Sequence, residues 1–83
     1  MKKLASAMGI PEDLSDKAVL LEMTGQNALR VENYLGIIEY SDSRLLLQCK
    51  NCRLEICGRH LFIESYARDE LQLRGCIEQI HYF

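Results

Sequence analysis

Four residues in the middle of the chain have the types and the spacing of zinc ligands. Two residues separate Cys49 from Cys52, and the same spacing recurs between Cys57 and His60. Two such pairs on neighbouring turns can surround a metal ion tetrahedrally, with thiolates and an imidazole as ligands. A small domain gains folding free energy from a site of this kind. One interpretation of the chain is therefore a small zinc-binding module that uses Cys49, Cys52, Cys57 and His60.

A second interpretation treats the same cysteines as ordinary thiols. Cys49 shares the apolar strand parity of Leu45 and Leu47, which would place it in the hydrophobic core, whereas Cys57 has the polar parity of its segment. A redox role for the Cys-x-x-Cys pair stays open, although no βαβ pattern accompanies it. Cys57 and His60 could pair as nucleophile and base, but no third group completes the set. We therefore expect no catalytic site and no cofactor, with the zinc site as the alternative.

Composition indicates one globular domain. The chain has 83 residues, of which 48% are hydrophobic and 27% charged, and this balance is typical of folded proteins. The net charge is −2 and the basic residues are scattered, so we expect no nucleic-acid partner. No apolar run approaches the ~20 residues of a membrane span, and the start of the chain lacks the long apolar core of a signal peptide. These features favour a cytoplasmic protein.

The elements that must position these residues are strands. From residue 18 to residue 83, apolar and polar side chains alternate with a period of two. Because successive side chains of a strand point to opposite faces, this alternation predicts strands with one buried and one wetter face. The segments are separated by turn residues at Gly25, 41–43, 50–51, Gly58 and Gly75. The pattern predicts an all-β domain, a small antiparallel sandwich or roll of seven to eight short strands.

Residues 1–17 differ from the rest and form a separate N-terminal arm. Leu4 and Met8 are four residues apart, as on one face of a helix, and Pro11 suits the first position of a second helical turn. We therefore predict a short helical segment here. The arm either docks on a surface or is a frayed tail.

A short stretch between two predicted strands contains our candidate contact residues. Asn33 can satisfy local backbone in a turn and Tyr34 can cover an edge of the core, which would make the stretch structural. Alternatively, Tyr34 joins Tyr40 and Tyr66 in a contact surface, because tyrosine is favoured at interfaces. The candidate interaction residues are Glu32, Asn33, Tyr34, Tyr40 and Tyr66.

Several stretches of the chain have the form of family motifs. The Val-Glu-Asn-Tyr sequence at 31–34 and the Ile-Glu-Tyr-Ser sequence at 38–41 are the more specific ones, and the apolar–polar–glycine segments at 54–58 and 71–75 add to them. Together these stretches resemble the YabP/YqfC family of sporulation proteins. The resemblance covers residues 18–83. The cysteine pair at 49–52 departs from it, since this pair is not a signature of the family.

The resemblance implies a non-catalytic protein of late sporulation, an interaction module in assembly of the spore envelope with its coat and cortex. It also implies synthesis in the mother cell, a position in the cytoplasm or at the periphery of the forespore membrane, and a membrane-bound sporulation protein as partner. Exposed strand edges could in addition pair copies of the chain into a homo-oligomer.

Overall fold

A computed structural model describes residues 18–83 as a single antiparallel sheet of six strands. The strands are β1 (Leu20–Thr24), β2 (Ala28–Glu32), β3 (Gly36–Tyr40), β4 (Arg44–Gln48), β5 (Arg53–Tyr66) and β6 (Glu70–Tyr82). Their order in the sheet is β1-β2-β6-β5-β4-β3. The all-β prediction is confirmed, and the predicted helical arm at 1–17 lies outside the described residues. Residues 18–83 contain no helix with the length and apolar character that crossing a bilayer would require.

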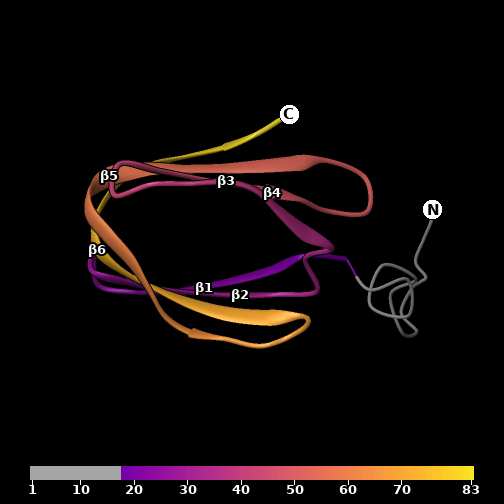
Figure 1. Cartoon of the computed structure of the whole chain (residues 1–83), viewed down its shortest axis with the longest axis horizontal. Helices are drawn as coiled ribbons and strands as arrows, with labels where there is room; N and C mark the ends of the chain where they lie inside the picture. The colour runs from indigo at the N-terminus through magenta and orange to yellow at the C-terminus, as the bar shows by residue number, and fades with distance from the viewer. Residues whose placement is uncertain (1–17) are drawn as a thin grey trace, which may run out of the picture.

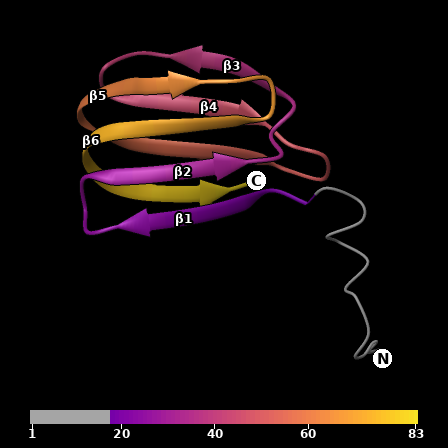
Figure 2. The ribbon, with the colours of Figure 1, turned by 90° about the horizontal axis from the view of Figure 1, so that it is seen from below.

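The sheet folds over on itself into two layers, because β5 and β6 are long enough to run through both (Figure 1). The layer that we call the β4 layer contains β3, β4, the first half of β5 and the second half of β6. The β2 layer contains β1, β2, the first half of β6 and the second half of β5. Figure 2 shows β3 and the second half of β5 together on one side of the molecule, and β1 with the second half of β6 on the opposite side.

Two of the predicted turns are bends inside long strands, so there are six strands and not seven or eight. The register of β5 and β6 shifts between Cys57 and Gly58, and Gly75 has a φ of 129°. A Cβ on Gly75 would be 2.5 Å from the carbonyl oxygen of His60. Glycine lets the two backbones approach this closely, and the chain bends there without reversing its direction.

The two layers enclose one hydrophobic core. Its central side chains alternate along their strands as the period of two predicts, and complete burial of each Leu or Ile contributes about 1.5–3 kcal/mol. In the β4 layer, the residues with at most 1% exposure are Leu45, Leu47, Leu54 and Ile56. In the β2 layer they are Leu29, Val31, Leu71 and Leu73. Cys49 joins them with 1% exposure, so its predicted place in the core is confirmed.

A bulge near the end of β5 changes which way its last residues face. Strict alternation would place Tyr66 on the face opposite Ile63, but the register shifts between Ile63 and Ser65. Tyr66 therefore pairs with the core residue Leu71. Its ring centroid lies 6.4 Å from that of Tyr34. The bulge brings Tyr66 to the rim of the core.

Candidate functional site

The large hydrophobic side chains that remain exposed follow the free edges of the sheet. In the part of the chain that the structure describes, each lies on β1, on β3, on the second half of β5 or β6, or directly next to one of these strands. Strands β2 and β4, which are paired on both sides, carry none of them. The residues are Leu20, Met23, Leu35, Ile38, Tyr40, Phe62, Tyr66, Tyr82 and Phe83.

Four of these residues define a surface that we call the β3–β5 side: Ile38, Tyr40, Phe62 and Tyr66. The hydroxyl of Tyr40 accepts a hydrogen bond from the Ile63 N–H at 2.9 Å, so its side chain reaches from β3 to the free edge of β5. Phe62 and Tyr66 are 51% and 64% exposed. Two predicted contact residues, Tyr40 and Tyr66, therefore share one side of the molecule and present aromatic surface there.

Tyr34 has a structural position beneath this surface. It is only 3% exposed, and its hydroxyl donates a hydrogen bond to the carbonyl oxygen of Ala67 at 2.6 Å. Burial first, and then the neighbouring Tyr66, raises the pKa of Tyr34 to about 12. Asn33, with a φ of 68°, donates from Nδ2 to the carbonyl oxygen of Ala18 at 3.0 Å. These contacts give Asn33 and Tyr34 structural positions, although Asn33 bonds the backbone of Ala18 and not backbone of its own turn.

Glu32 belongs to a charged cluster on the outer face of the β2 layer. Arg30 donates hydrogen bonds to the Glu32 carboxylate, and its guanidinium also lies 3.4 Å from Glu70 and 3.8 Å from Glu22. The hydrogen bond to Glu32 is the main reason why the pKa of Arg30 is raised, and the negative charges of Glu32 and Glu70 add to this effect. The structure thus gives Glu32 an ion-pair partner on its own strand, apart from the tyrosines.

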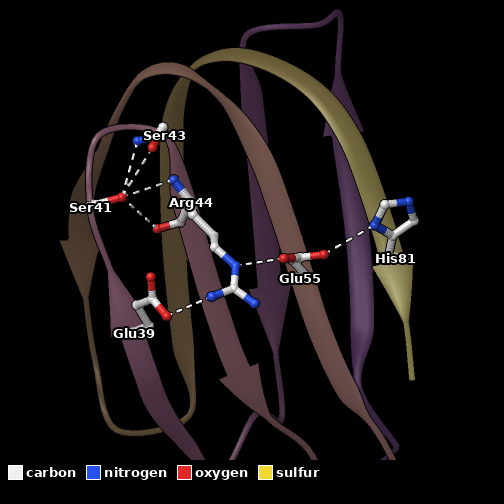
Figure 3. A network of polar contacts seen from close by, with 6 residues as sticks. All are labelled: Glu39, Ser41, Ser43, Arg44, Glu55 and His81. Carbon is white, nitrogen blue, oxygen red and sulfur yellow. Dashed lines mark hydrogen bonds and ion pairs between the residues drawn. The ribbon is translucent and has the colours of Figure 1, made fainter.

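A polar network crosses the outer face of the β4 layer and joins all its strands (Figure 3). Arg44 donates to Glu39 at 2.6 Å and to Glu55 at 2.5 Å, and Nδ1 of His81 lies 3.1 Å from Glu55. The hydrogen bond with His81 and then that with Arg44 lower the pKa of Glu55, whose side chain is 17% exposed. Sequence reasoning missed this network. Only the shared outward parity of its members, on separate strands, could have indicated it.

The structure does not bring the four predicted zinc ligands together. Cys49 faces the core, where burial raises its pKa to about 11, and its N–H donates to the carbonyl oxygen of Cys52 at 2.9 Å. Cys57 pairs with Arg44 on the outer face of the β4 layer, and His60 lies at the bend of β5 with a φ of 55°. Within residues 18–83, no three His, Cys, Asp or Glu side chains gather to hold a metal ion.

Comparisons with known proteins cover most of the chain. A family model described as the YabP family matches residues 15–83, a range that includes every strand from β1 to β6. The chain is 27% identical over 79 residues to a Bacillus subtilis (strain 168) protein named "Uncharacterized protein YqfC", and this covers 95% of the chain and 85% of that protein. No solved structure matches. The extent of the family match shows that the chain belongs to the YabP family.

Proposed function

We propose that the chain is a non-catalytic sporulation protein that acts as an interaction module in late assembly of the spore envelope, its coat and cortex. Membership of the YabP family supports the sporulation role. The observation that carries the interaction role is the restriction of exposed large hydrophobic side chains to the free edges and their flanks. Exposed apolar side chains beside unpaired strand edges are typical of surfaces that bind other proteins. The partner is a membrane-bound sporulation protein, met from the mother-cell cytoplasm at the forespore membrane.

The β3–β5 side is the surface that fits this partner. Phe62 on the outer face and Tyr66 at the rim of the core flank the free edge of β5 from its two faces and supply large aromatic area there. Aromatic residues contribute most of the binding free energy at many interfaces. Tyr66 rests against the buried Tyr34, so its side chain loses little freedom on binding. An ion pair of 2.7 Å between Arg74 and Glu64 lies on the same outer face as Phe62 and supplies a polar rim.

The experiment is complementation of a deletion in a spore-forming host. A Phe62→Ser, Tyr66→Ser double variant should fail to restore heat-resistant spores and should recover less of the membrane-bound partner in pull-downs from sporulating cells. The matched control is Gln72→Ser, an exposed position on the central strand of the same layer. Thermal unfolding of both purified variants verifies that they fold. Full complementation by the double variant would contradict the proposed surface, and normal spores in the deletion strain would contradict the sporulation role.

A further inference from the structure

The free edge of β1 differs from the edges on the opposite side of the molecule. Strand β3 has a register irregularity between Ile37 and Glu39, and β5 has one between Ile63 and Ser65. The Tyr40 hydroxyl also accepts the hydrogen bond of the Ile63 N–H, so this edge group of β5 already has a partner. Bulges and edge-covering side chains are means by which sheets avoid pairing with other chains. By contrast, β1 pairs with β2 through five consecutive residues without a shift, and it contains no proline.

Backbone N–H groups at the bend of β6 are hydrogen-bonded as well. The carbonyl oxygens of Gln26 and Asn27, in the turn after β1, accept hydrogen bonds from the N–H groups of Ile77 and Gly75. Among residues 18–83, this leaves β1, with the last residues of β6 in the other layer, as the uninterrupted edge on its side of the sheet (Figure 2). An uninterrupted edge offers its backbone groups to another strand, so the occupant that fits it is a strand.

We propose that β1 pairs antiparallel with β1 of a second copy, so that the β2 layer continues across a two-fold dimer. The sequence of β1 favours a register centred on Leu21. A two-fold axis through Leu21 places Leu21 opposite its counterpart and Leu20 beside Glu22 of the second copy. An axis through Glu22 would set two carboxylates directly opposite each other, which destabilises a sheet. An axis through Met23 would run the pairing into the turn at Gly25.

The pairing has a physical benefit for the rim of the core. Leu20 and Met23 are both 40% exposed in the single chain, and Leu21 packs against the edge of the core. In the proposed register, Met23 meets Val19 of the second copy, which also packs against the core. The dimer thus removes apolar surface from water on both copies. It leaves the β3–β5 side free on the opposite side of each copy, so this inference stands independently of the proposed function.

The test is the oligomeric state of the purified 83-residue chain, measured by sedimentation equilibrium over a range of micromolar concentrations. The wild-type chain should be a dimer. Leu20→Glu should weaken dimerisation about tenfold, because two symmetry-related pairs of like charges would form. Leu20→Lys alters the same exposed position but places a cation beside Glu22 of the second copy, so it should preserve the dimer. The charge exchange Leu20→Glu, Glu22→Lys should restore it.

A monomeric wild-type chain at all these concentrations would overturn the proposal. So would a dimer that is equally stable in Leu20→Glu and Leu20→Lys, since charge at this position must matter in the proposed register. A dimer that dissociates only in the Phe62→Ser, Tyr66→Ser variant would move the interface to the β3–β5 side and would likewise overturn it.

Discussion

Gly58 lies against the carbonyl oxygen of Cys76, and a Cβ at Gly58 would be far inside van der Waals contact with that oxygen. The obstacle is backbone on the neighbouring strand, which a rotamer change cannot relieve. Gly58→Ala should therefore lower the free energy of unfolding by about 1–3 kcal/mol, the usual cost of overpacking. Urea denaturation followed by circular dichroism measures this change.

Two other glycines provide controls for this prediction. Nothing lies within 4 Å of a Cβ built on Gly36, so Gly36→Ala should change stability little. Gly25 also has open space but a φ of 60°, and Gly25→Ala should cost about 1–2 kcal/mol through backbone strain alone. Equal effects of Gly58→Ala and Gly36→Ala would show that the close approach at the bend is unimportant.

The Glu55 carboxylate should make the domain sensitive to acid. Its hydrogen bonds with His81 and Arg44 hold its pKa below the ordinary value in the folded state. Such a group stabilises the fold fully above its unfolded pKa of about 4.3, and this contribution is lost as the pH falls through the folded pKa. Glu55→Gln should therefore lose less stability than the wild type between about pH 5 and pH 3.

Urea denaturation at several pH values measures how steeply the free energy of unfolding falls on acidification in Glu55→Gln and in the wild type. The control is Glu22→Gln, which removes a carboxylate from the other layer and leaves the network intact, so the acid sensitivity due to Glu55 should persist. If Glu55→Gln and the wild type lost stability in parallel on acidification, the network would have no influence on the titration of Glu55.

The hydroxyl of Tyr34 should be worth a measurable part of the stability. Tyr34→Phe keeps the buried ring but leaves the carbonyl oxygen of Ala67 without its donor. The free energy of unfolding should fall by about 0.5–1.5 kcal/mol. Tyr82→Phe, at an exposed ring, is the matched control and should be near neutral. Thermal unfolding compares the variants, and a neutral Tyr34→Phe would argue against this hydrogen bond.

Cys49 should react with alkylating reagents more slowly than the other cysteines. Burial raises the pKa of its thiol to about 11, so very little thiolate is present at pH 8, and the core also blocks access. Iodoacetamide labelling of the native chain, read by peptide mass spectrometry, should modify Cys52 and Cys76 first. In denaturant all four thiols should react alike. Fast labelling of native Cys49 would contradict its place in the core.

The alternation of apolar and polar side chains predicted the β segments, because successive side chains of a strand point to opposite faces and this pattern can be read within a short stretch of sequence. The same reasoning placed Cys49 in the core correctly. It misassigned Gly58 and Gly75 as turns, because a glycine marks both a turn and a close backbone approach. Only the neighbouring strand, with Cys76 and His60, distinguishes the two cases.

The candidate site was predictable in part. Tyr40 and Tyr66 emerged as exposed tyrosines, but Tyr34 could not be separated from them, since its burial depends on packing against core residues far along the chain. The network around Glu55 left only the shared outward parity of Glu39, Arg44 and Glu55 on consecutive strands as a signal. The addition of His81 depends on the pairing of β5 with β6, whose register the local sequence does not specify.

The long bent strands also determine when this protein can fold as the ribosome makes it. Strand β2 can pair with β1 as soon as both are synthesised, but its other neighbour in the sheet is β6. Leu29 therefore gains its partner on that side only when Leu73 has been synthesised. The final residues of β6 then complete the β4 layer beside β5. Because the first half of β6 completes the β2 layer and its second half completes the β4 layer, apolar side chains of the earlier strands stay uncovered until β6 has been synthesised, and the domain folds only when nearly all of residues 18–83 are present.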